Sequence, residues 1–157
     1  MDECLFCKII RGEISSRKVY EDADCIAFLD INPANPGHVL VVPKAHSENI
    51  YDVTENELKK AIIVVKKVAV DIKEKFNAQG INVMQNNGRI AGQIVSHIHF
   101  HVIPRFENDS VIISYKRTHL TDNQLEEVQK RLAGEKQAAK ETSASFDRRI
   151  KDLEMEL

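Results

Sequence analysis

The chain has 157 residues, of which 43% are hydrophobic and 29% are charged, and its net charge is −2. This size fits one domain, and this balance excludes an intrinsically disordered protein. The small net charge gives no general attraction to nucleic acid or to a membrane surface, and no apolar run approaches the ~18 residues that span a bilayer.

Short strands and loops alternate in the first third of the chain. The residues after Cys4 form a loop or a short helical turn, and residues 18–21 and 25–30 have the composition of two strands separated by an acidic turn. The prolines and the glycine of Asn32-Pro33-Ala34-Asn35-Pro36-Gly37 indicate a loop. Residues 38–42 are rich in Val and Leu and predict a buried strand that Pro43 ends.

A long helix follows. Thr54-Glu55-Asn56-Glu57 is a capping box, in which the Thr and Glu side chains satisfy main-chain N–H groups at the start of a helix. Apolar residues then recur at helical spacing, at Leu58, Ile62, Val65, Ala69 and Ile72. This pattern predicts one amphipathic helix that runs toward Phe76, with Gly80 as a stop signal.

The rest of the chain contains further strands and helices. Residues 81–85 and 95–103 indicate strands, the second closed by Pro104. A second capping box, Thr121-Asp122-Asn123-Gln124, starts a helix, and Phe146, Ile150, Leu153 and Leu157 recur on one helical face of the tail. We expect an α+β domain on an antiparallel sheet over residues 1–120, and a helical extension over 121–157 that packs on the domain or on a dimer partner.

The run His97-Ile98-His99-Phe100-His101 carries the clearest chemical signal. Side chains alternate along a strand, so the three imidazoles share one face, roughly 7 Å apart, and the apolar residues between them face the core. Such a row on an exposed strand permits two chemistries. One is zinc binding, although no carboxylate lies in this strand to activate a bound water. The other is nucleophilic attack on phosphorus by one neutral imidazole, with the others binding oxyanion charge.

Loops beside this row favour the second chemistry. Asn86-Asn87-Gly88 and Ala91-Gly92-Gln93 lie just upstream, and they can present main-chain N–H groups and side-chain amides to a phosphate. Glycine lets the main chain approach a ligand closely. We therefore interpret this region as a phosphate site with a histidine nucleophile.

These motifs resemble the histidine triad (HIT) superfamily. The resemblance is carried by Gly92-Gln93-Ile94-Val95-Ser96-His97-Ile98-His99-Phe100-His101-Val102-Ile103-Pro104, by Phe28-Leu29-Asp30-Ile31-Asn32-Pro33 with Gly37-His38-Val39-Leu40-Val41-Val42-Pro43-Lys44-Ala45-His46, and by Phe6-Cys7-Lys8-Ile9-Ile10-Arg11-Gly12-Glu13-Ile14. It covers about residues 4–106, and it is strongest to the bacterial HIT branch related to nucleoside phosphoramidate hydrolases. It implies a HIT-like fold.

The resemblance also implies an activity, namely a hydrolase or nucleotidyl transferase acting at the α-phosphate of a purine nucleotide. His99 would attack the phosphorus of a phosphoramidate or dinucleoside polyphosphate and form a covalent nucleotidyl-histidine. His101 would bind phosphate oxygens, and His38 would complete the cluster behind the row that begins at His97. The remaining nucleotide-binding residues implied are Asn86, Gly92, Gln93 and Ile94 for the phosphate, Asp30 for the ribose, and Leu5, Phe6, Ile9, Phe28 and Ile31 for the base.

One position departs from the family pattern. The residue after Gly-Gln is usually Ser or Thr, whose hydroxyl assists the leaving group, and here it is Ile94. We expect low turnover of phosphoramidates. Ile94 also keeps an alternative open, in which the protein is a nucleotide-binding module with little catalysis that acts through a partner. A zinc hydrolase is a third interpretation.

Cysteines suggest a metal site. Cys4-Leu5-Phe6-Cys7 is a C-x-x-C that lies outside any thioredoxin-like pattern, which argues against a redox pair. Within the HIT resemblance, His46 and His97 are its partners in a structural zinc site with two Cys and two His ligands. Cys25 is expected in the core.

The resemblance further implies a homodimer, paired through the long helix and an adjacent strand. The start of the chain, Met1-Asp2-Glu3-Cys4, lacks the features of a signal peptide, and three cysteines fit a reducing compartment. We expect a cytoplasmic protein with a purine nucleotide substrate and neither nucleic acid nor a membrane as partner.

Overall fold

The computed structural model describes residues 4–113 and 116–134 and divides the chain into two units, residues 1–113 and 114–157. The first unit contains a five-stranded sheet and two α-helices, which confirms the expected α+β class. Across the described residues, no helix combines the length and the hydropathy needed to cross a membrane.

The sheet is antiparallel throughout, and its strands lie in the order β1-β2-β3-β5-β4. Its strands are β1 (Lys18–Glu21), β2 (Cys25–Leu29), β3 (Val39–Pro43), β4 (Gly80–Met84) and β5 (Phe100–Arg105). In the centre, Leu40 of β3 and Met84 of β4 flank His101 of β5 from either side. The sheet therefore holds one histidine of the motif between two strands.

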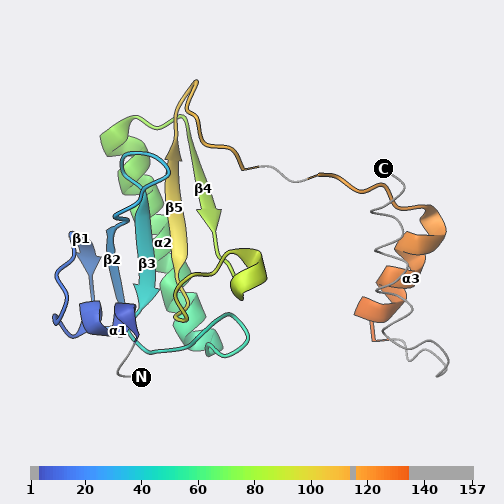
Figure 1. Ribbon diagram of the computed structural model, residues 1–157, viewed down its shortest axis with the longest axis horizontal. Helices are drawn as coiled ribbons and strands as arrows, with labels where there is room; N and C mark the ends of the chain where they lie inside the picture. Colours follow the sequence, from blue (N-terminus) through green and yellow to red (C-terminus); the bar gives the residue numbers. More distant parts are fainter. Residues whose placement is uncertain (1–3, 114–115, 135–157) are drawn as a thin grey trace. The chain divides into compact units, whose positions relative to one another are not determined.

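Each face of the sheet carries one helix (Figure 1). Helix α2 (Glu55–Phe76) packs on one face, where its buried residues join a core cluster with residues of β2, β3 and β5. The short helix α1 (Leu5–Ile10) contributes Phe6 and Ile9 to a second cluster, which contains Ile26, Phe28, Leu40 and Val42. The α1 segment thus lies over the face opposite α2.

Helix α2 begins as its capping box predicts. The N–H of Glu57 donates to Oγ1 of Thr54 over 3.3 Å, and the N–H of Thr54 donates to the Glu57 carboxylate over 3.1 Å. The helix ends at Asn77, whose left-handed conformation (φ 52°) stops it before Gly80. Ile62, expected on the buried face, is 47% exposed, and the helix instead buries Ala61, Val64, Val65, Val68 and Ile72.

Strand ends differ from those expected from sequence. Pro43 is the last residue of β3, so it ends this strand as expected, whereas Pro104 lies within β5, which continues to Arg105. Strand β5 begins at Phe100, five residues later than expected from 95–103, because the chain bends before it and the N–H of His97 donates to the carbonyl of Val95 over 2.8 Å.

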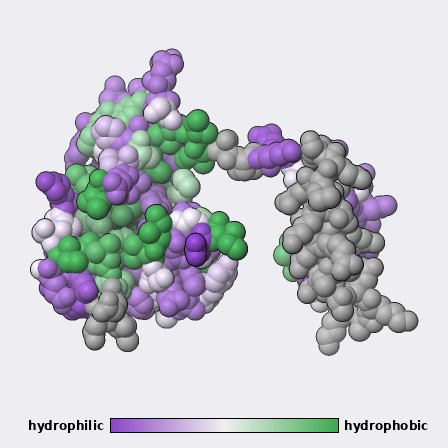
Figure 2. Space-filling view, in the orientation of Figure 1, coloured by the Kyte–Doolittle hydropathy of each residue, from purple (hydrophilic) through white to green (hydrophobic). Residues whose placement is uncertain are grey.

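The second unit contains helix α3 (Asp122–Leu132), which starts at the predicted second capping box on Thr121. The tail residues Phe146, Ile150, Leu153 and Leu157 lie outside the described residues, and the extension's packing remains a prediction. On the first unit, Figure 2 shows hydrophobic surface interrupted by hydrophilic residues. Its largest exposed apolar side chains include Ile31, Tyr51, Ile90 and Ile94.

Candidate active site and metal centre

The histidine row lies on the α1 side of the sheet. We expected an exposed row, but His97 and His99 are buried and His101 is half-buried. His97 is 0% and His99 is 5% exposed, because the ring of Phe6 packs edge-on against both, with centroids 6.0 and 5.1 Å apart. The intervening apolar side chains face α2, as the alternation predicts: Ile98, Phe100 and Val102. Burial lowers the pKa of His99 and lowers that of His97 to about 4, so both imidazoles are neutral near pH 7.

The tautomer of His99 follows from one hydrogen bond. Its Nδ1 lies 2.7 Å from the main-chain oxygen of His97, and because a carbonyl only accepts, Nδ1 carries the proton. The Nε2 atom is therefore the unprotonated nitrogen, with a lone pair. A neutral imidazole with a free Nε2 lone pair has the form that nucleophilic attack requires.

A chain of hydrogen bonds with a fixed direction runs from Ala34 through His38 to His101. The N–H of Ala34 donates to Nδ1 of His38 over 3.1 Å, so the proton of His38 resides on Nε2, which donates to Nδ1 of His101 over 3.0 Å. His101 is left with a proton on Nε2, which suits it to donate to a phosphate oxygen. Burial and the neighbouring His99 and His38 lower the pKa of His101 to about 4. Asp30, whose carboxylate lies 3.6 Å from Nδ1 of His38, completes the group.

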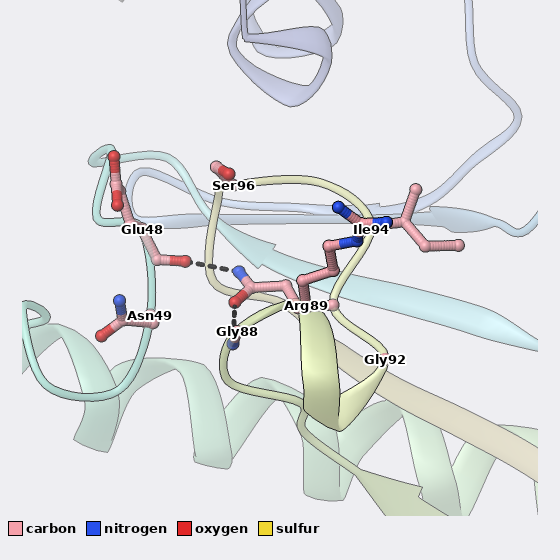
Figure 3. Close-up of a pocket in the computed structure, with 8 residues that line it drawn as sticks. Glu48, Asn49, Gly88, Arg89, Gly92, Ile94 and Ser96 are labelled. Atoms are coloured by element: carbon pink, nitrogen blue, oxygen red, sulfur yellow. Dashed lines mark hydrogen bonds between the residues drawn. The ribbon is translucent and has the colours of Figure 1, made fainter.

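The loop before the row is held in shape by Gln93. Its Nε2 donates to the carbonyls of Glu48 (2.6 Å) and Val95 (3.0 Å), and its Oε1 accepts from the N–H of Gly88 over 2.7 Å (Figure 3). Its main-chain N–H also bonds to Gly88, over 3.1 Å. Gln93, predicted to bind phosphate, thus has its donors committed to the loop.

Two other residues of this region, Asn86 and Ile94, each have a hydrogen-bond donor without a partner among the described residues, and Gly92 lies beside Asn86. Gly92 has φ 88°, a conformation that favours glycine, and a Cβ there would lie 3.5 Å from Nδ2 of Asn86. That Nδ2, like the main-chain N–H of Ile94, makes no hydrogen bond among the residues the structure describes. The two donors therefore remain free for a ligand, as the phosphate-site prediction requires.

The residues expected to surround the base separate into two groups. Phe6, Ile9 and Phe28 are at most 7% exposed and belong to the core cluster on the α1 side. Leu5 is 43% and Ile31 is 87% exposed. Their contact with a base remains a prediction.

Cys4, Cys7, His46 and His97 come together as the predicted metal site, with all four ligand atoms within 4.8 Å of one another. Three of the four sulfur–nitrogen pairs are 3.4 to 3.6 Å apart, and the Nδ1 atoms of the two histidines are 3.2 Å apart. A tetrahedral zinc with ordinary bond lengths places S and N about 3.6 Å apart and two N about 3.4 Å apart. The residues therefore fit zinc, and Nε2 of His97 bonds to the carbonyl of Pro43 over 2.9 Å, as outer-shell partners of metal ligands do.

The histidine row does not form one metal site of its own. His97 turns its Nδ1 to the cysteines, whereas His99 uses Nδ1 on a carbonyl. A second cluster, Asp30, His38 and His101, has ligand atoms within 4.8 Å, but the two histidine nitrogens that meet there share a proton and the other His38 nitrogen accepts from Ala34. This arrangement disfavours a zinc hydrolase built on the row.

A buried ionic clamp behind the site was not predicted from the sequence. Arg105 holds Asp109 through two bonds of 2.8 Å, and Asp109, whose side chain is 6% exposed, also accepts from Nδ2 of Asn35 over 2.9 Å. Asn35 donates to the carbonyl of Pro104, and its own carbonyl accepts from the N–H of His38 over 3.0 Å. The clamp thus fastens the loop that carries His38 to β5. The charged pair at i and i+4 just after Pro104 was the available signal.

Comparison with known proteins agrees with this geometry. Residues 11–108 match the HIT domain family. A HIT-like protein of Methanocaldococcus jannaschii is 48% identical over 131 residues, which cover 83% of this chain and 99% of that protein. An adenosine 5'-monophosphoramidase of Candida albicans is 46% identical over 106 residues, covering 65% of this chain and 70% of that enzyme. The crystal structure of a zinc-bound histidine triad family protein from Mycobacterium smegmatis superposes with a TM-score of 0.68 at 31% identity, covering 86% of this chain and 99% of that one.

Proposed function

The chain belongs to the HIT domain family, and on that premise we propose that it cleaves a purine nucleotide at the α-phosphate through a covalent nucleotidyl-His99 intermediate. The single observation that carries the proposal is the tautomer of His99, which leaves Nε2 unprotonated on a buried imidazole whose ring centroid lies 5.0 Å from that of His101. The similarity to an adenosine 5'-monophosphoramidase supports a nucleoside phosphoramidate as substrate, and a dinucleoside polyphosphate is the other substrate that the family resemblance implies.

The reaction has two displacements. Nε2 of His99 forms a bond to the α-phosphorus as the P–N or P–O bond to the leaving group breaks, and the leaving group takes up a proton. Water then breaks the bond between phosphorus and Nε2, which releases the nucleoside monophosphate and restores His99. Neutral His99 is needed at the start, and its lowered pKa supplies that form near pH 7.

Uncharged hydrogen-bond donors bind the negative phosphate in the proposed mechanism. The Nε2 proton of His101, which the chain from Ala34 through His38 fixes, donates to one phosphate oxygen. Nδ2 of Asn86 and the N–H of Ile94 donate to others, and Gly92 permits the close approach. Asp30 binds the ribose hydroxyls, and the apolar residues Leu5, Phe6, Ile9, Phe28 and Ile31 surround the base, which leaves adenine and guanine both acceptable.

We assign a structural zinc to Cys4, Cys7, His46 and His97. It supplies no reacting group, since all four positions of a tetrahedral ion are filled by protein. Its expected effect is to tie the segment that carries Phe6 to the residue before the nucleophile. Cysteines that bind zinc and form no disulfide with each other also suit the reducing cytoplasm, where we place the protein.

We also propose a homodimer, as the family resemblance implies. Strand β4 is an edge of the sheet, and exposed apolar side chains lie on it and on α2, among them Val83, Ile63 and Val70. Pairing of two copies would cover these side chains and the open strand edge. Light scattering at micromolar concentration tests this, with twice the chain mass expected and the single-chain mass contradicting it.

Trapping the intermediate tests the proposed function. Protein mixed with an adenosine phosphoramidate and quenched in base, where a phosphohistidine bond survives, should gain the mass of one nucleotidyl group on the peptide that contains His99.

A second candidate function is that of a nucleotide-binding module with little catalysis, which Ile94 favours because its side chain is 94% exposed and has no hydroxyl. Tight binding of AMP without any adduct or turnover would establish that candidate instead.

A further inference from the structure

A cavity of about 480 Å³ opens between the loop after β3 and the loop that leads into β5 (Figure 3). Glu48 lies on the first wall, and Arg89, Gly92, Ile94 and Ser96 lie on the second. The side chain of Gln93 joins the two walls through its bonds to the carbonyl of Glu48 and the N–H of Gly88. The cavity therefore has walls that are fixed to each other.

The residues that line this cavity relate it to the phosphate loop and not to the nucleoside residues. It shares Gly92 and Ile94 with the loop that we assign to the α-phosphate, and it includes none of the residues that we assign to the base or the ribose. A group that is cleaved from the α-phosphorus cannot occupy the nucleoside side. The space next to the phosphate loop and away from the nucleoside is where such a group would lie.

We propose that this cavity is the leaving-group subsite and that Arg89 selects an amine leaving group that carries an anionic substituent. This inference rests on the proposed function. In the step that it concerns, the P–N bond breaks as the bond from Nε2 of His99 to phosphorus forms. The departing nitrogen takes up a proton and leaves as the free amine, with its carboxylate or phosphate group still attached.

Arg89 has the chemistry and the freedom that this role requires. It is exposed at the start of the short 3-10 turn η1 (Arg89–Ala91), and it pairs with no acidic side chain in the described part of the chain. Its planar guanidinium matches the two oxygens of a carboxylate or phosphate. Figure 3 shows Arg89 extending from this turn toward Ile94.

Glu48, the acidic residue of the cavity wall, is placed differently. Its main-chain oxygen faces the cavity and accepts from Gln93, and Figure 3 shows its carboxylate directed away from Arg89 and Ile94. Of the two charged side chains that line the cavity, Arg89 is therefore the one that is placed to meet an anionic group. Beside it, the side chain of Ile94 is 94% exposed and offers an apolar surface to the carbon atoms between the scissile nitrogen and the anionic group.

The test compares three substrates that differ only in the end of the leaving group. AMP is joined through a P–N bond to β-alanine, to β-alaninamide or to O-phosphoethanolamine, and kcat/KM is measured for each. We expect the β-alanine conjugate to exceed its neutral amide by about fivefold, the upper range for an exposed ion pair. A higher value for the phosphoethanolamine conjugate would identify phosphate as the preferred anion, and a higher value for β-alanine would identify carboxylate.

Three variants assign the preference to a residue. Arg89→Gln should bring the ratio of β-alanine to β-alaninamide close to one. Glu48→Gln, which removes the acid of the cavity, should keep the ratio or raise it. Arg17→Gln removes an exposed arginine outside the cavity and should leave the ratio as in the wild type.

Two results would overturn the inference, and a third would overturn the proposed function as well. Equal kcat/KM for the charged and neutral conjugates in the wild type, or a ratio that survives in Arg89→Gln, contradicts the role of Arg89 while turnover itself supports the enzyme. Absence of turnover and of a His99 adduct with all three conjugates contradicts the enzyme and, with it, the subsite.

Discussion

The main-chain oxygen of His97 lies 2.7 Å from Nδ1 of His99, while the ring of His97 turns its own Nδ1 to the two cysteines of the metal site. One residue therefore belongs to the metal centre through its ring and to the nucleophile through its main chain. Whatever fixes the His97 ring also fixes the acceptor that sets the tautomer of His99. The zinc ligands and the reacting nitrogen are thus parts of a single arrangement.

Loss of a metal ligand should reduce zinc content, stability and activity together. In Cys7→Ser we expect zinc to fall from one ion per chain to a small fraction, and the Tm to fall because the closed site contributes directly to folding. Metal analysis and thermal unfolding measure both. The matched control is Cys25→Ala, a buried cysteine outside the cluster, which should keep its zinc. Full zinc occupancy in Cys7→Ser would contradict the assigned ligand set.

The directed chain behind His101 predicts a loss in the chemical step. His38→Phe keeps an aromatic ring but removes the N–H that donates to His101 over 3.0 Å, so the proton of His101 is no longer held on Nε2. We expect kcat to fall by roughly 10- to 100-fold, the value of a hydrogen bond to a charged group. His119→Phe alters an exposed histidine outside the motif and serves as the control. An unchanged kcat in His38→Phe would show that the chain has no part in catalysis.

Restoring a hydroxyl at position 94 should raise turnover. Ile94→Ser places a donor beside the leaving group, and we expect kcat on a phosphoramidate to rise by about tenfold, since one added transition-state hydrogen bond has that value. Ile94→Ala shortens the side chain without adding a hydroxyl, so steady-state kinetics of the two variants separate size from chemistry. Equal rates in both would mean that bulk alone, rather than the missing hydroxyl, limits the reaction.

The clamp on Asp109 predicts a stability that depends on pH. The Arg105 guanidinium and the N–H of Phe106 hold the pKa of the Asp109 carboxyl well below its usual range. This contribution is fully present above the unfolded-state pKa of about 3.9, and it is lost as the pH falls through the lower folded value. Asp109→Asn should lower the Tm by at least about 5 °C at pH 7, and the difference from wild type should shrink below pH 4. A pH-independent difference would argue against the charge as its source.

Local signals gave reliable predictions. The capping boxes at Thr54 and Thr121 start their helices as expected, because their hydrogen bonds join residues three positions apart. The alternation around His99 also places the histidines and the apolar residues on opposite faces. The burial of His99 could not be predicted from the strand alone, because the residue that covers it, Phe6, lies more than 90 residues earlier in the sequence. The hydrogen bond to His38 from Ala34 uses a main-chain donor, for which the residue type gives no signal.

The most direct test of the central claim is the turnover of an adenosine phosphoramidate by the wild type beside His99→Ala. Both proteins should first be shown to carry equal zinc, so that the variant reports the nucleophile and not the fold. We predict a loss of 10³-fold or more in kcat for His99→Ala, the size expected for a removed nucleophile. A variant that retains the wild-type rate would contradict a nucleotidyl-His99 intermediate.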